Sequence, residues 1–234
     1  MAPLFSIWLD LIRDPKLDRR FGSVFLMVPT GALIAGTFYG TKAEFEATDI
    51  VDRFPGDPRR HMVLTDWRGS MAHESERLGL HLTNLATPFY SKSLSFTRQD
   101  VPPPDKVRDL FRWVDTQEKG TPLWFIIFDC SGGAISDVPM NATAFAHRDK
   151  ILYYQSYFVG LPMTSKIKDF VTNFHNQLML ATPAAFGTYP GYVDPELPDA
   201  LRQYWGPNLP RLQEIKQMWD PADLFHNPQS VRQM

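Results

Sequence analysis

The sequence predicts an α+β fold, in which a largely antiparallel sheet carries helices over one face. Runs rich in β-branched and aromatic residues are separated by stretches whose apolar residues recur at helical spacing. Two such runs follow each other across a short turn, so the order lacks the strict strand–helix alternation of a parallel sheet. The 20 prolines are scattered along the chain, which is typical of short elements joined by rigid turns.

The first elements are predicted to be a helix, a hairpin and a second helix. Apolar residues over 4–13 share one helical face. Residues 23–40, SVFLMVPTGALIAGTFYG, contain two β-rich arms around a Pro-Thr-Gly turn and predict strand, turn and strand. Thr41 followed by Glu44 is a capping-box pattern, and it predicts the start of a helix over about residues 41–54.

The middle of the chain is predicted to hold strands around one helix. HMVLTDW (residues 61–67) predicts a strand, and FYSKSLSFT (89–97) predicts a strand or an extended loop. A run of three prolines then precedes a helix with apolar residues at helical spacing between 107 and 114. The unbroken apolar run in PLWFIIFDC (122–130) predicts a strand that is buried on both faces.

The last part of the chain is predicted to contain two strands and three helices. ILYYQSYFV (151–159) predicts a strand, and an amphipathic helix is expected over 167–178. FGTYPGYVD (186–194) is predicted to be a short strand that ends in a Pro-Gly bend. Two helices are expected near 196–204 and 208–219, followed by an extended tail.

Composition excludes several classes of function. A net charge of −2 gives no basic surface for nucleic acid. No apolar run approaches the roughly 18 residues needed to cross a membrane, and the acid-containing first residues do not form a secretory signal. Cys130 is the single cysteine, so the chain has neither an internal disulfide nor a paired-cysteine metal site, and no metal is expected. Dinucleotide and phosphate-loop motifs are also missing.

Some residues have both a structural and a chemical interpretation. Asp129 ends the most apolar strand, where a carboxylate either turns to water or needs a partner or a cavity. A lone cysteine such as Cys130 is usually an inert buried side chain. Asn141 begins a glycosylation sequon, and the His147-Arg148 pair suits hydrogen bonding or ligand binding. The two phenols of YPGY (189–192) either close the edge of a core or face a reacting molecule.

Six ordered motifs in the C-terminal half resemble the berberine-bridge-enzyme-like flavoprotein oxidases, within the vanillyl-alcohol-oxidase fold group. The resemblance is specific from about residue 122 to residue 232. In chain order the motifs comprise Asp129, Gly132 and Gly133; Thr143, Ala144, Phe145, His147 and Arg148; Tyr189, Gly191, Tyr192 and Asp194; Tyr204, Trp205, Gly206, Asn208, Arg211 and Leu212; Lys216, Asp220, Pro221 and Phe225; and Pro228, Gln229, Ser230 and Val231.

This resemblance implies an FAD-linked oxidoreductase with an N-terminal FAD-binding half and a C-terminal half that holds the substrate site. The chain resembles the C-terminal half, so its implied partners are a small-molecule substrate and a missing or separate FAD-binding half. Residues 1–194 are then the substrate-binding sheet domain. Residues 195–234 are the C-terminal helices and the tail, which would pack on the FAD domain.

The resemblance also implies roles for the bend. In the family's carbohydrate oxidases, the second tyrosine of the motif takes the proton of the substrate hydroxyl and the aspartate assists; by position these are Tyr192 and Asp129. Flavin contacts are implied for Tyr189, Gly191 and Tyr192, and Gly191 stands where the family has asparagine. Two other classes of function stay open: a non-redox binding protein that kept the fold, and a cofactor-free enzyme that uses Tyr192 and Asp129 as acid and base.

Overall fold

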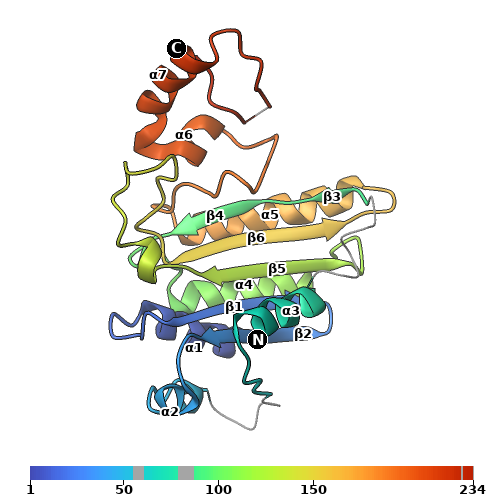
Figure 1. Ribbon diagram of the computed structural model, residues 1–234. Coiled ribbons are helices and arrows are strands. Elements are labelled where there is room, and N and C mark those ends of the chain that lie inside the picture. The colour runs from blue at the N-terminus through green and yellow to red at the C-terminus, as the bar shows by residue number, and fades with distance from the viewer. Residues whose placement is uncertain (55–60, 79–86, 228, 234) are drawn as a thin grey trace.

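The computed structural model describes residues 1–54, 61–78, 87–227 and 229–233, and its centre is a six-stranded sheet (Figure 1). The strand order is β2-β1-β5-β6-β3, and β4 also pairs with β6; every one of these pairs is antiparallel. The strands are β1 (Phe21–Val28), β2 (Gly31–Phe38), β3 (Phe89–Tyr90), β4 (Ser93–Phe96), β5 (Trp124–Cys130) and β6 (Leu152–Val159). The predicted antiparallel α+β class is therefore confirmed.

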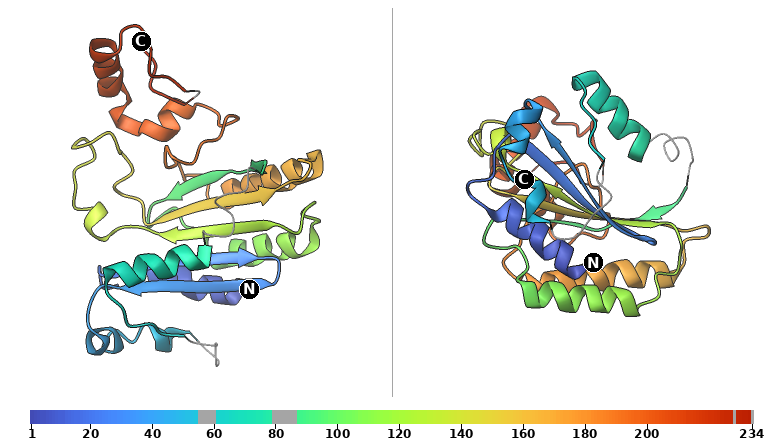
Figure 2. Two further views of the ribbon diagram at one scale, coloured as in Figure 1. Left: turned by 45° about the vertical axis from the view of Figure 1, so that its right-hand side comes forward. Right: turned by 90° about the horizontal axis from the view of Figure 1, so that it is seen from below.

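Three long helices cover one face of this sheet, as the view from below in Figure 2 shows. They are α1 (Ala2–Arg13), α4 (Pro104–Thr116) and α5 (Ser165–Ala181). Apolar residues recur on one side of each helix and meet the inward side chains of β1, β5 and β6. Aromatic rings fill the junction: Phe5 of α1 packs within 4.6 Å of Phe128 and 4.8 Å of Phe25, measured between ring centroids.

The N-terminal elements agree with the sequence prediction, except that one helix is shorter. The hairpin of β1 and β2 forms with Phe21 opposite Phe38. The capping box at Thr41 and Glu44 is present and opens α2, but α2 spans only Lys42–Glu46. The backbone at Asp49 is left-handed, with φ of 52°, and a left-handed residue does not continue an α-helix. A short 3₁₀ turn (Val51–Arg53) follows.

The predicted strand over residues 61–67 is wrong. Residues 61–66 have no regular structure, and helix α3 (Trp67–Leu78) begins where the strand should end. The apolar residues of this run are exposed; Leu64, for example, is 69% exposed. A β-rich run forms a strand only when a neighbouring strand accepts its backbone hydrogen bonds, and the run finds no such neighbour among the described strands.

Strand β5 forms as predicted, but it is not buried on both faces. Trp124, Ile126 and Phe128 are buried against the helices, whereas the alternate side chains are only partly covered. The reason is the one-sided helix layer, since α1, α4 and α5 all pack on the same face. The second face therefore presents half-buried side chains, and Asp129 is among them.

Residues 186–194 do not form the predicted strand, although they end in the predicted bend. The segment runs beside β4, where Ser95 donates its backbone N–H to the Gly187 carbonyl oxygen at 2.8 Å. Single contacts of this kind replace a strand ladder. At the bend, the Tyr192 N–H donates to the Tyr189 carbonyl oxygen at 2.9 Å and closes a turn around the Pro-Gly pair.

The C-terminal helices are α6 (Ala200–Trp205) and α7 (Leu209–Trp219), close to the predicted limits. Together with the tail they lie beyond the β4 side of the sheet, at the top of Figure 1. Pro228, part of the last sequence motif, lies outside the described residues. None of the helices in the described parts of the chain is long and apolar enough to span a membrane.

Candidate active site

The register of the central strands brings a carboxylate and an amide to the same side of the sheet. In the β5–β6 pair, Asp129 lies opposite Tyr153 and Ile127 lies opposite Gln155. Asp129 and Gln155 are therefore diagonal neighbours on one face, which is within reach for long side chains. The Gln155 Nε2 donates to Asp129 Oδ2 at 2.8 Å. The sheet alone thus supplies a partner for the strand-end carboxylate.

Tyr192 reaches the same amide from the bend. Gln155 Nε2 also donates to the Tyr192 hydroxyl oxygen, at 3.0 Å. Because an amide NH₂ group has two hydrogens, one nitrogen serves both acceptors. The two residues implied as a proton-transfer pair, Tyr192 and Asp129, therefore share Gln155. Tyr189 lies beside them, and its ring meets the Tyr192 ring edge-on at 5.2 Å between centroids.

Burial raises the pKa values of both Asp129 and Tyr192, and neighbouring groups add to the rise at Tyr192. Burial raises the pKa of the Asp129 carboxyl, and the hydrogen bond from Gln155 lowers it in part. Burial is also the largest cause that raises the pKa of the Tyr192 phenol. The negative charge of Asp129 and the neighbouring Tyr157 raise it further. The hydrogen bond from Gln155 acts in the opposite direction there as well. Gln155 thus stabilises a negative charge on either partner.

Gly191 is explained by the position of Tyr189. A Cβ atom at residue 191 would lie 2.5 Å from Cε1 of the Tyr189 ring, so any side chain there displaces that ring. The glycine lets the phenyl ring fold over the bend. Where the family has an asparagine side chain, this chain has the edge of an aromatic ring, and Tyr189 is 44% exposed.

The other residues that the sequence suggested take structural positions. Burial raises the pKa of the Cys130 thiol to about 11, so the thiol is a poor nucleophile. His147 is buried, and its Nε2 lies 3.0 Å from the Tyr204 carbonyl oxygen. Arg148 donates to the threonine hydroxyl of the exposed Asn141 sequon. Among the described residues, no group of three His, Cys, Asp or Glu side chains is placed to hold a metal ion.

Sequence reasoning missed Gln155, the residue that joins the site. Its signal was present, because one amide interrupts the aromatic and apolar run of β6. A buried glutamine needs partners for its amide group, and only 8% of Gln155 is exposed. The register that places it beside Asp129 is a property of strand pairing and was not available from the sequence of β6 alone.

Comparisons with known proteins agree with this architecture. Residues 188–232 match the family model "Berberine and berberine like". The FAD-linked oxidoreductase sorD of Penicillium rubens is 31% identical over 98% of this chain and 50% of its own length. A carbohydrate oxidase of Microdochium nivale is 31% identical over 85% of the chain and 43% of its own length. A glucooligosaccharide oxidase structure from Acremonium strictum superposes with a TM-score of 0.82 at 23% identity, over the whole chain and 52% of that protein.

These matches also show what fraction of a relative's length the chain covers. The chain spans about half the length of the curated relatives it matches, with 50% and 43% coverage of the two named above. The family-model match includes the bend, the closing helices and the tail. The chain therefore belongs to the berberine-bridge-enzyme-like FAD-linked oxidoreductases and corresponds to the C-terminal half of a family member.

Proposed function

We propose that this chain is the substrate-binding half of an FAD-dependent oxidase or dehydrogenase that acts on an alcohol, a sugar or a secondary metabolite. In this proposal Tyr192 and Asp129 form the proton-accepting pair of the reaction. The observation that carries the proposal is the single Gln155 amide nitrogen that donates to both of them. Residues of a strand and of a distant bend are otherwise not expected to share one donor.

The residues at this site fit the reacting end of a flavin. The Tyr192 phenol and the Asp129 carboxylate meet at Gln155, on the face of β5 that is only partly covered, and Tyr189 packs beside Tyr192 and is 44% exposed. We propose that Tyr189, Gly191 and Tyr192 border the cofactor. The sequence has no phosphate-cradling loop for the rest of FAD, which accords with a second half holding it. When bound, FAD supplies the hydride-accepting chemistry.

The chain's own contribution is to hold and accept a proton. An ordinary phenol has a pKa of about 10, so a proton normally stays on the Tyr192 oxygen at neutral pH. Because the charge of Asp129 contributes to the raised pKa of Tyr192, protonation of Asp129 removes that contribution. In this proposal that proton is the one that leaves the Tyr192 hydroxyl, and the phenolate left behind, which is a stronger base than the carboxylate, takes the proton of the substrate hydroxyl. Gln155 supports either charge state, since it donates to both oxygens.

The tail supports the proposal of a partner half. Trp219, Leu224 and Phe225 are 79%, 76% and 82% exposed, and Met218 on α7 is 67% exposed. Several large apolar side chains exposed on one short segment often mark a site for a partner. We propose that this surface and the predicted segment 195–234 pack on the FAD-binding half. Trp205 and Tyr192, by contrast, are only half-exposed.

The test uses the chain joined to an FAD-binding half, by fusion or as a second chain. Tyr192→Phe is expected to lower turnover by roughly 10²–10⁴-fold, which is the usual loss when a general base is removed. Tyr39→Phe is the matched control, because it removes an exposed phenol that directly follows the edge strand β2, outside the site. Unchanged turnover in Tyr192→Phe rejects the role of the pair. Turnover by the chain alone without flavin supports the cofactor-free alternative instead.

A further inference from the structure

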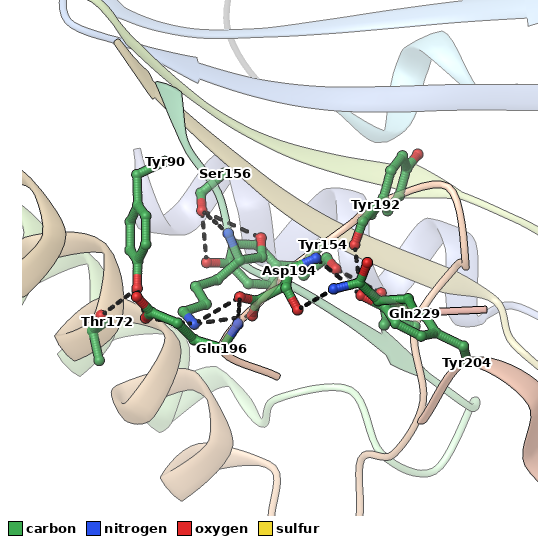
Figure 3. A network of polar contacts seen from close by, with 12 residues as sticks. Tyr90, Tyr154, Ser156, Thr172, Tyr192, Asp194, Glu196, Tyr204 and Gln229 are labelled. Carbon is green, nitrogen blue, oxygen red and sulfur yellow. Dashed lines mark hydrogen bonds and ion pairs between the residues drawn. The ribbon is translucent and has the colours of Figure 1, made fainter. Parts of the chain in front are cut away.

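A nearly buried ion pair lies next to the proposed proton-accepting pair and has no part in the chemistry described above. Lys92 Nζ donates to both carboxylate oxygens of Asp194, at 3.1 and 2.9 Å. The two side chains are only 8% and 4% exposed. Glu196 extends the group, with Oε2 at 3.5 Å from the same ammonium, and it also accepts from the Tyr90 hydroxyl. Figure 3 shows this network around Asp194.

The network also binds backbone groups of Tyr192 and Asp194, on the two sides of Val193. The Tyr204 hydroxyl donates to the Tyr192 carbonyl oxygen at 3.2 Å and accepts from the Asp194 N–H at 2.9 Å. Gln229 Nε2 donates to the Asp194 carbonyl oxygen at 3.3 Å. In Figure 3 the Tyr192 carbonyl faces this network, whereas its phenol points away from it. The polar groups therefore hold the main chain and leave the phenol free to meet Gln155.

Lys92, which binds Asp194, and Gln155, which binds the Tyr192 phenol, lie close together at the paired strands β4 and β6. Ser93, the first residue of β4, lies opposite Gln155 of β6. Lys92 directly precedes Ser93, and its backbone is fixed to the next residue of β6, because Ser156 N–H donates to the Lys92 carbonyl oxygen at 3.0 Å. The bend is thus tied to one pair of strands at two points, Asp194 to Lys92 and Tyr192 to Gln155.

We propose that Lys92 is a positioning residue for Tyr192, which it acts on through the ion pair with Asp194. The placement of the phenol follows from the structure alone, and its consequence for turnover rests on the proposed function. Residues 189–194 have no helix or strand of their own to fix them. Without the ion pair the bend keeps the contacts made by Tyr204 and Gln229, but it loses its tie to Lys92, the residue before the strand that pairs with β6 beside Gln155.

A charged anchor suits this task better than an apolar contact. Burying an ion pair is expensive, and apolar side chains of similar volume often stabilise a protein as well. The ion pair adds direction, since Lys92 meets both oxygens of one carboxylate. Burial lowers the pKa of Lys92, but the hydrogen bond and charge of Asp194 outweigh it, so that the net pKa is raised. The anchor therefore stays charged across the neutral range.

The first test measures the phenol in the chain itself by NMR of ¹³C-labelled tyrosine, with Tyr192→Phe identifying the Tyr192 signal. The groups that face this phenol are Asp129 of β5, Tyr157 and Gln155 of β6, and Tyr189 of its own bend. Burial, the charge of Asp129 and the neighbouring Tyr157 and Tyr189 raise the pKa of the native phenol above the ordinary value of about 10, and the hydrogen bond from Gln155 offsets only part of that rise. A phenol that leaves this site loses these influences and is expected to titrate at a lower pH than the native one.

Lys92→Met is expected to produce that downward shift, and Lys92→Arg is expected to restore the native titration. Because Lys92→Met leaves the Asp194 carboxylate unpaired, the double variant Lys92→Met/Asp194→Asn repeats the test without a buried lone charge. Lys42→Met, which removes an exposed lysine from a surface ion pair, is the matched control. A native Tyr192 titration in both Lys92→Met and the double variant overturns the proposal.

The second test uses the chain joined to its FAD-binding half and separates the two proposals. A misplacement of about 1 Å costs up to roughly 10²-fold in rate, so kcat of Lys92→Met is expected to fall by about 10- to 100-fold with a smaller change in KM. If Tyr192→Phe keeps its turnover, the proposed function fails, whereas a shifted titration in Lys92→Met still supports the anchor. If Tyr192→Phe loses turnover and Lys92→Met does not, the positioning role alone fails.

Discussion

Replacing Gln155 with leucine tests the centre of the site in the chain alone. The substitution removes two hydrogen bonds from one nitrogen, at 2.8 Å to Asp129 and at 3.0 Å to Tyr192. A hydrogen bond to a charged group contributes about 1.5–3 kcal/mol and one between neutral groups about 0.5–1.5 kcal/mol. The free energy of unfolding is therefore expected to fall by about 2–4.5 kcal/mol when Asp129 is ionised.

The loss is expected to depend on pH because Asp129 titrates. Burial raises the folded pKa of Asp129 above its unfolded value near 3.9, so the folded state binds more protons between these two values. Stability then declines as pH rises through that window. Gln155 lowers the folded pKa of Asp129, so Gln155→Leu raises it further and makes the decline larger. When Asp129 is protonated both lost bonds are neutral, and the expected loss is about 1–3 kcal/mol.

The assay is urea unfolding followed by tryptophan fluorescence, at about pH 4.5 and pH 8, with stability obtained by linear extrapolation. The difference in the free energy of unfolding between the native protein and Gln155→Leu should be about 1 kcal/mol larger at pH 8 than at pH 4.5. Gln117→Leu is the control, because the Gln117 side chain is exposed and bonds only an exposed hydroxyl. A difference that is the same at both pH values, or one below about 0.5 kcal/mol, refutes the reasoning.

Three further predictions concern the cofactor, the tail and the bend. The purified chain is expected to be colourless and to bind added FAD weakly, because it spans about half the length of its relatives; a stoichiometric flavin absorption band contradicts this. Replacing exposed Trp219 and Phe225 with serine should reduce self-association and hydrophobic-dye binding, and unchanged values in light scattering and dye fluorescence argue against a partner surface there. Gly191→Asn should lower the free energy of unfolding by about 1–3 kcal/mol through the clash with Tyr189, and Tyr189→Ala should remove most of that loss in a double-mutant cycle.

The sequence predicts most elements whose apolar spacing is regular. Helices α1, α4 and α5 and strands β1, β2, β5 and β6 form where the periodicity indicates. Their patterns are strong because each element buries one face in the same core. The capping box at Thr41 is also local chemistry, and the structure contains it. Such features depend on residues within one turn or one strand, so residues that are close together in the sequence are sufficient to specify them.

The errors concern features that depend on distant partners. Residues 61–66 and 186–194 contain β-forming residues, but they do not pair as strands. The second face of β5 is half-buried because all three long helices pack on the other face of the sheet. An apolar run in the sequence does not show on which face the helices will pack. Helix α2 ends at Glu46, and the left-handed backbone at Asp49 prevents a helix from continuing to the predicted end. Strand pairing and layer placement are decided by the whole chain.

The sequence by itself determined the fold class and the family, because the residues of each motif lie close together in the chain, and through that resemblance it also suggested Asp129 and Tyr192 as the proposed proton-accepting pair. Only the tertiary structure decided that one amide, Gln155, joins them and that Lys92 ties the bend to the same strands. The physical reason is register. A hydrogen bond is made within about 3 Å, and antiparallel pairing of β4, β5 and β6 brings residues far apart in sequence to that distance.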